Sequence, residues 1–419
     1  MQSFTTDETS RVAEVDETTE KRPVVEKNAP PANTGTRFAR WVDAFKHIWP
    51  IYLATHIIFL LLTYLVAVLL LNPYGSPPSP LHVMLGFWDH WDTQHFITIA
   101  TAGYAKPLDS AFFPLYPLLI HIVTFILRSP LVSALFVANI AGFAVLLLLY
   151  RLVADEFGEE RAERSVLYLA IFPTAFFLAA GYSESLFLLC TLASFYWMRR
   201  GHWWLAGLAA LFAGLTRATG VALFVPLCYE YLRQRDFQWR RIRFDALACT
   251  GAGLGILIYS VYCYLRFHDF LAFSHAEAAG WGRQWTLPWQ PLLLAAHNIL
   301  SLDILNFFSI QNVVMLSVML GVLAVLVLSF VGPWKFASKD LTYPLYAVAI
   351  YLFCTSATVT IPSSSPLDSA DRYMLAAFPV FIVLAAMGKN RHFHFFYQAL
   401  GFSLIAFWQL HFLMHRLVL

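Results

Sequence analysis

Residues 48–71 read IWPIYLATHIIFLLLTYLVAVLLL, a largely apolar run of the length that a membrane-crossing helix needs. Similar runs recur along the 419-residue chain, in which 59% of the residues are hydrophobic and 13% are charged. A soluble domain carries about 25% charged residues. The composition therefore indicates an all-α polytopic membrane protein. Because no basic stripe with interleaved aromatic residues occurs, nucleic acid is not expected as a partner.

The apolar segments predict about eleven transmembrane helices in one domain, 48–419, preceded by a disordered cytoplasmic tail, 1–47. The start of the tail is rich in Glu, Thr and Pro and poor in aromatic residues, as disordered segments are. Segment 111–127 is excluded from the spans because Pro114 and Pro117 interrupt hydrogen bonding in its first half. What remains of it suits an interfacial or re-entrant helix. The predicted spans are 48–71, 131–152, 165–180, 184–198, 202–216, 218–232, 244–266, 305–332, 341–359, 372–388 and 395–413.

The distribution of basic residues predicts the orientation of these spans. With eleven spans, most of the 28 lysines and arginines fall on the same side of the membrane as the N-terminal tail. Because lysine and arginine mark the cytoplasmic side, residues 72–130 are predicted to form a long first outer loop that carries short amphipathic helices. The expected location is a bacterial plasma membrane, or the endoplasmic reticulum in a eukaryote. The lack of any Asn-x-Ser/Thr sequon favours the bacterial membrane.

Polar residues gather in this outer loop, where residues 87–104 read FWDHWDTQHFITIATAGY. On a helix, Asp89, Asp92 and Phe96 would share one face, and His95 would lie on the neighbouring stripe. A helix lying among the lipid headgroups would have the same pattern. A metal site built from these aspartates and histidines lacks standard ligand spacing. Further ionisable residues occupy the other short outer turns, namely Glu184, Arg217, Asp371 and Arg372.

A signature of fixed positions begins in the same stretch. WDTQHFITIATAGY (91–104) is followed by AFFPLYPLLI (111–120), and then by YSESLF (182–187), LTRATG (215–220) and DRYMLAAFP (371–379). In this order the segments closely resemble the PIG-V-like mannosyltransferase family, which comprises the glycosylphosphatidylinositol mannosyltransferase 2 enzymes and their bacterial homologues.

The resemblance implies the multi-span GT-C fold and a mannosyltransferase that uses polyprenyl(dolichyl)-phosphate-mannose as its sugar donor. The implied acceptor is a glycolipid, phosphatidylinositol-type or other. In that fold an aspartate of the first outer loop is the catalytic base, a role that maps onto Asp92. A base must lie within hydrogen-bond reach of the acceptor hydroxyl. Asp89, His95 and Glu184 are the candidates for catalytic support.

The departing phosphate needs arginines or helix N-termini around it. Arg217 and Arg372 are predicted at outward helix ends, where they would bind the phosphate of the sugar donor. As alternatives, Arg217 could snorkel at a turn, and Arg372 could pair with Asp371 or Asp368. Attack opposite a β-linked phosphate would give an α-mannoside by inversion. No cofactor and no metal ligands are expected, although a divalent cation stays open.

Two other classes of protein fit the composition. A transporter or lipid flippase predicts inverted repeats and ionisable residues near the middle of the membrane. The sequence has no convincing internal repeat, and its acidic residues cluster toward the outer side. A scaffold subunit is the third class, and it would not require Asp92. The substitution Asp92→Asn separates the classes, because it should abolish transfer by an enzyme and leave a flippase or a scaffold working.

Overall fold

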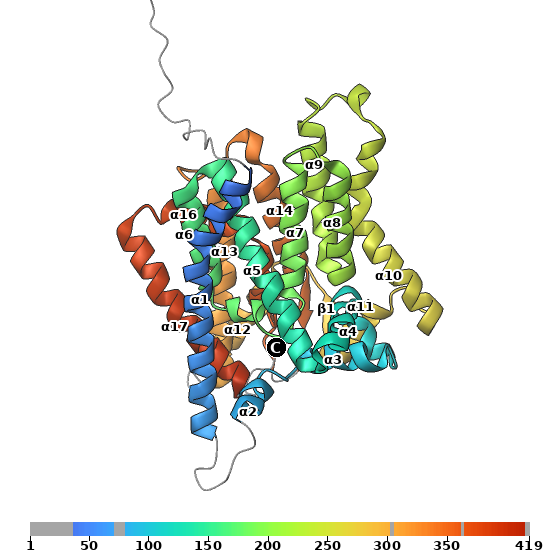
Figure 1. The fold of residues 1–419 in the computed structure, drawn as a ribbon, viewed down its shortest axis with the longest axis vertical. Helices are drawn as coiled ribbons and strands as arrows, with labels where there is room; N and C mark the ends of the chain where they lie inside the picture. Colours follow the sequence, from blue (N-terminus) through green and yellow to red (C-terminus); the bar gives the residue numbers. More distant parts are fainter. Residues whose placement is uncertain (1–36, 71–79, 302–305, 362–363, 415–419) are drawn as a thin grey trace, which may run out of the picture. The chain divides into compact units, whose positions relative to one another are not determined.

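The N-terminal helix is longer than the predicted first span. α1 (Arg37–Leu70) begins inside the predicted tail, because Ala44 and Ile48, one helical turn apart, are fully buried and extend its packed face. The predicted disorder of 1–36 lies outside the described residues. The computed structural model (Figure 1) describes residues 37–70, 80–301, 306–361 and 364–414.

Three short helices follow within the predicted outer loop. The last, α4, has 13 residues and is therefore about 20 Å long. The apolar core of a bilayer is about 30 Å thick, so α4 is too short to cross it upright, in line with its exclusion from the spans. The three helices are α2 (Pro80–Gly86), α3 (Asp92–Ala102) and α4 (Leu115–Leu127), with the 3₁₀ turn η1 (Pro107–Ala111) between the last two.

The next helix, α5 (Pro130–Phe157), has clear sequence signals at both ends. The Ser129 hydroxyl accepts a hydrogen bond from the backbone N–H of Val132, and Pro130 occupies the first helical position. The helix ends at Gly158, whose φ of 93° favours glycine. α5 packs against α6 and α7, so it forms the middle of the bundle.

The bundle continues with helices that pack closely through glycines. α7 packs against α8, and α8 packs against α10. A Cβ atom on Gly251 would lie 2.1 Å from the carbonyl oxygen of Gly207, so these two helices touch backbone to backbone. The helices are α6 (Glu159–Ala170), α7 (Glu184–Met198), α8 (Trp203–Thr216), α9 (Phe224–Arg233) and α10 (Gly251–Phe267).

A two-stranded sheet joins distant parts of the chain. β1 (Arg283–Trp285) pairs antiparallel with β2 (Ala357–Val359), with Arg283 opposite Val359. Figure 1 shows α3, α4, α11 and β1 together near one end of α7 and α8. The remaining helices are α11 (Ala272–Trp281), α12 (Gln290–Ser301), α13 (Phe307–Phe330), α14 (Thr342–Thr355), α15 (Ala370–Tyr373), α16 (Pro379–Met387) and α17 (Arg391–Leu413).

The helices make the chain a multi-pass membrane protein, and the all-helical class is confirmed. Among the described residues, four helices are long and apolar enough to cross a bilayer, and a fifth span results if a pair bent by 84° counts as one. Four shorter apolar helices, α4, α7, α8 and α14, accompany them. The predicted number of eleven therefore stays a prediction. The long helices cover Phe38–Leu70, Pro130–Phe157, Phe244–Phe267 and Phe307–Phe330, and the bent pair is Ala370–Ala376 with Pro379–Met387.

Besides the bent pair, which lies in the predicted span 372–388, two further predicted spans are not continuous helices. In the predicted span 165–180, α6 ends at Ala170, shortly before Pro173, which cannot continue a helical hydrogen-bond ladder. In the predicted span 341–359, α14 ends at Thr355 and the chain continues as β2. Both predictions were wrong because an apolar run does not by itself distinguish a helix from a buried turn or strand.

Candidate active site

Arg372 lies at the centre of a group of charged side chains from four separate segments. Its Nη1 donates a hydrogen bond to Asp92 Oδ2 at 2.9 Å, and its Nε lies 3.0 Å from Glu184 Oε1. Only 4% of Arg372 and 5% of Glu184 is exposed. A buried charge is stable only when it is paired, so these ion pairs hold α3, α7 and α15 in register.

Asp92 and Glu184 both occupy the first position of a helix. Asp92 begins α3 and Glu184 begins α7. Free backbone N–H groups and the helix dipole favour negative charge there. Glu184 Oε1 also accepts a hydrogen bond from Arg217 Nη1 at 2.7 Å, whereas its Oε2 has no hydrogen-bond partner among the described residues. Glu184 lines a small pocket together with Arg217, Arg372 and Tyr373.

Tyr373 brings a third arginine into the group. Arg283 Nη1 donates a hydrogen bond to the Tyr373 hydroxyl at 3.0 Å. The guanidinium carbons of Arg217, Arg283 and Arg372 lie 4.6, 5.4 and 5.2 Å from the centre of the Tyr373 ring. Cations at this distance are attracted to the ring face. All three arginines therefore contact the same tyrosine ring.

A cavity of about 160 Å³ is lined by Asp92, Tyr373 and the three arginines, but not by Glu184. Its polar wall carries the three arginines and Asp92, and its other wall is aromatic, with Phe112, Trp281 and Trp285. Asp368 also lines the cavity, and burial raises the pKa of its carboxyl to about 7. A cavity with an aromatic wall and clustered cations fits a ligand that has both a ring and an anionic group.

Two predicted site residues lie away from the ion pairs. Asp89 is not on the helix: Trp91, with φ of 52°, separates it from α3, so the prediction that Asp89 and Asp92 share a helical face was wrong. Burial raises the pKa of the Asp89 carboxyl. The His95 ring stacks on Phe112, with ring centres 4.7 Å apart, and meets Trp281 edge to face. His95 therefore supports the aromatic wall from behind.

The described residues contain no group of three or more His, Cys, Asp or Glu side chains placed to hold a metal ion. The site is instead dominated by alternating carboxylates and guanidinium groups, which satisfy one another.

Three residues that line the cavity were not identified from the sequence, namely Arg283, Tyr373 and Asp368. The contacts of the arginines with Tyr373 were not predicted either. Arg283 lies in the 268–304 loop, and it reaches the site only through the pairing of β1 with β2. A local signal was available, because WGRQW (281–285) places an arginine between two tryptophans, whose rings attract cations.

Comparison with known proteins supports the resemblance seen in the sequence. The chain is similar to GPI alpha-1,6-mannosyltransferase 2 of Mus musculus, with 34% identity over 175 residues, which are 39% of this chain and 35% of the mouse protein. The protein of the same name from Homo sapiens is 32% identical over 162 residues, 36% of this chain and 33% of the human protein. The matched part thus spans about a third of the length of these relatives.

The chain is also similar to two solved structures, at lower sequence identity. ArnT from Cupriavidus metallidurans bound to undecaprenyl phosphate is 16% identical, with a TM-score of 0.48, over 74% of this chain and 59% of that chain. The Archaeoglobus fulgidus oligosaccharyltransferase is 14% identical, with a TM-score of 0.41, over 88% and 55%. The family model described as mannosyltransferase (PIG-V) matches residues 57–414, which include every residue of the site, and the chain therefore belongs to the PIG-V mannosyltransferase family.

Proposed function

We propose that the protein is a GT-C-class membrane glycosyltransferase that transfers mannose from a polyprenyl-phosphate carrier to a glycolipid. The observation that carries this proposal is the meeting of Asp92 with three arginines in one cavity. Membership of a mannosyltransferase family is the reason for proposing mannose as the transferred sugar. The names of the mouse and human relatives, which specify an alpha-1,6 linkage, support an α-mannoside product.

The arginines bind the phosphate of the sugar donor. Guanidinium groups form paired, charge-assisted hydrogen bonds with phosphate oxygens, and Tyr373 holds Arg217, Arg283 and Arg372 close enough to act together. The phosphate competes with Asp92 for Arg372. When Arg372 turns to the phosphate, it releases the Asp92 carboxylate for catalysis.

Asp92 is the catalytic base. It accepts the proton of the acceptor hydroxyl, whose oxygen attacks the anomeric carbon from the face opposite the phosphate. The new carbon–oxygen bond forms as the bond to the phosphate oxygen breaks, and the electron pair leaves with the polyprenyl phosphate. The arginines stabilise the negative charge that develops there. A β-linked sugar donor gives an α-linked product.

The other predicted residues position the sugar. Glu184 does so indirectly: it lines a smaller neighbouring pocket and holds Arg217 and Arg372 through its ion pairs. Trp281 and Phe112 contact the apolar face of the sugar, with His95 behind them. Asp89 does not contact the sugar, and its carboxylate affects Asp92 only through its negative charge. The mechanism needs no cofactor, and the site faces the non-cytoplasmic side of a bacterial plasma membrane, or of the endoplasmic reticulum.

The test supplies purified protein in lipid–detergent micelles with radiolabelled polyprenyl-phosphate-mannose and a membrane lipid extract. The proposal predicts that label moves to a new lipid and that α-mannosidase releases it. A protein that binds the labelled carrier and moves it across vesicle membranes without forming a new lipid would instead be a transporter.

A further inference from the structure

A second cavity, of about 590 Å³, lies at the opposite end of α7 from the candidate active site. α7 begins at Glu184 in the active site, and its 15 residues make it about 22 Å long. Trp197, in its last turn, and Arg200, just beyond its end, line the second cavity. Arg40 of α1 and Arg151 of α5 complete its cationic wall. The two cavities are therefore separate sites.

The second cavity carries an excess of positive charge. Among the described residues that line it, Asp155 is the only carboxylate, and three arginines share it. Arg151 Nη2 lies 2.5 Å from Asp155 Oδ1, Arg40 Nη1 lies 3.6 Å from the same oxygen, and Arg200 pairs with Oδ2. Three guanidinium groups against one carboxylate leave two positive charges without a matching carboxylate in this lining.

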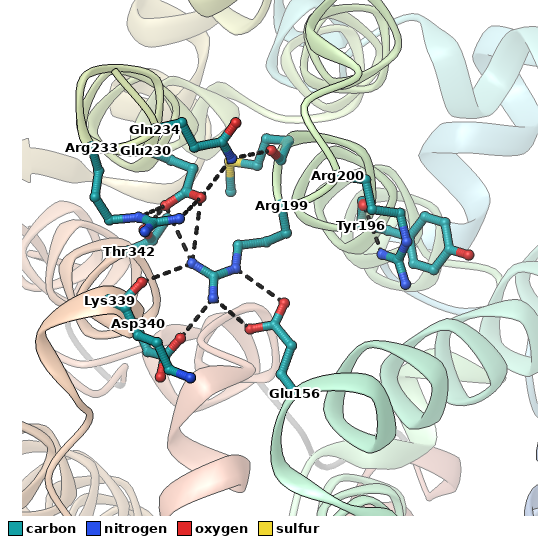
Figure 2. A network of polar contacts seen from close by, with 11 residues as sticks. Glu156, Tyr196, Arg199, Arg200, Glu230, Arg233, Gln234, Lys339, Asp340 and Thr342 are labelled. Carbon is teal, nitrogen blue, oxygen red and sulfur yellow. Dashed lines mark hydrogen bonds and ion pairs between the residues drawn. The ribbon is translucent and has the colours of Figure 1, made fainter. Parts of the chain in front are cut away.

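The neighbouring arginine, Arg199, is surrounded by carboxylates that balance its positive charge. Arg199 lies 2.8 Å from Glu156, 3.3 Å from Glu230 and 2.6 Å from Asp340. Figure 2 shows Arg200 pointing away from this cluster, beside Tyr196. The chain thus surrounds one of two consecutive arginines with carboxylates and leaves the other facing a cavity rich in cations.

Arg151 gives the cavity an unsatisfied hydrogen-bond donor. Only 5% of this residue is exposed, and its Nε has no hydrogen-bond partner among the described residues. The Nε of Arg40 is also without one. A buried donor left without an acceptor is costly, and phosphate oxygens are the acceptors that guanidinium groups bind best. The cavity is therefore suited to a phosphate group.

The position of the cavity favours a lipid as the source of that phosphate. α1 and α5 are both candidate membrane spans. Arg40 and Trp41 lie near the start of α1, and Arg151 lies near the end of α5, so the cavity is at the ends of two spans. Tryptophan and tyrosine concentrate at this level of a bilayer, among the headgroups, and Trp41, Tyr196 and Trp197 all line the cavity.

We propose that this cavity is a binding site for the phosphate headgroup of an anionic phospholipid. The lipid belongs to the leaflet on the side of the N-terminal end of α1. Its phosphate contacts Arg40, Arg151 and Arg200, and its glycerol backbone lies against the tryptophans. A lipid bound there ties α1 to α5 and α7 at the end of the bundle remote from catalysis.

The test measures lipid retention by the purified full chain in detergent, using native mass spectrometry. Phosphatidylglycerol and phosphatidylcholine are supplied separately, and inorganic phosphate is added as a competitor. The wild type should retain phosphatidylglycerol in preference to phosphatidylcholine. The double variant Arg40→Gln with Arg200→Gln should lose about twenty-fivefold in affinity for phosphatidylglycerol, since each cation near an anionic lipid surface contributes about fivefold.

A matched variant separates this site from general surface charge. Arg241 is an exposed arginine that pairs with Asp236 outside the cavity, and Arg241→Gln should retain phosphatidylglycerol as the wild type does. Equal retention of the two lipids by the wild type would overturn the proposal without any variant. If Arg241→Gln lost as much affinity for phosphatidylglycerol as the double variant, the proposal would also be overturned. If inorganic phosphate at equal concentration displaced the lipid, the site would bind free phosphate instead.

Discussion

At the residue scale, Arg283 is the cation whose removal tests phosphate binding with least damage to the ion pairs. It contacts Tyr373 and lies 3.6 Å from Glu277, and it does not pair with Asp92 or Glu184. A hydrogen bond to a charged group contributes about 1.5–3 kcal/mol. Arg283→Gln should therefore lower kcat/KM for the sugar donor by about 10- to 100-fold with an unchanged unfolding temperature. The exposed Arg128→Gln is the control, and equal activity of the two variants would exclude Arg283 from the phosphate site.

The carboxyl of Asp368 predicts a pH dependence of sugar-donor binding. Burial raises its pKa to about 7, against the attraction of Arg283. A raised pKa means that the folded protein prefers the protonated carboxyl, so stability falls as the pH rises from the unfolded-state value through about 7. The negative charge formed over that range also repels the donor phosphate. The donor KM should rise through pH 7 in the wild type and stay flat in Asp368→Asn, whereas identical profiles would contradict this role.

The residues of the site were predictable to different degrees. Asp92, Glu184, Arg217 and Arg372 were expected near one face of the membrane, and the structure brings all four together. Their pairing was not predictable, because each lies in a different segment of the chain. Arg283 could not be placed at all, since only the contact of two short strands carries it to the cavity.

At the element scale, the contact between α8 and α10 depends on glycines. A Cβ atom on Gly214 would lie 2.2 Å from the carbonyl oxygen of Ala252, whereas one on Gly253 would meet nothing within 4 Å. Overpacking costs about 1–3 kcal/mol. Gly214→Ala should therefore lower the thermal unfolding midpoint in detergent, and Gly253→Ala, on the same pair of helices, should not. A lower midpoint in both variants would show that helix packing is not the cause.

The helices agree with the predicted spans where an apolar run is long and has a clear signal at each end. The predicted span 184–198 matches α7, and 131–152 lies within α5, which Ser129 and Gly158 delimit. The strands were missed because three residues are too few to show an alternating pattern. α3 begins later than expected because Trp91 adopts a left-handed φ, which no sequence pattern indicates for a tryptophan.

At the scale of the whole molecule, the orientation in the membrane is the prediction with the widest consequences. From the positive-inside rule, we predict that the candidate active site faces the non-cytoplasmic side. Single cysteines introduced as Lys106→Cys near the site and Arg241→Cys at the other end should therefore react with a membrane-impermeant maleimide from opposite sides of sealed cells, with the wild type as the blank. Labelling of Lys106→Cys only after permeabilisation would place the site in the cytoplasm.

The central claim is that Asp92 is the base in mannosyl transfer, and one comparison tests it most directly. Transfer from radiolabelled polyprenyl-phosphate-mannose is measured at saturating sugar donor for the wild type, Asp92→Asn and the neighbouring Asp89→Asn. Because a general base contributes about 10²- to 10⁴-fold, Asp92→Asn should lose at least a hundredfold in kcat while still binding the donor, and Asp89→Asn should lose far less. Full turnover by Asp92→Asn would contradict the account.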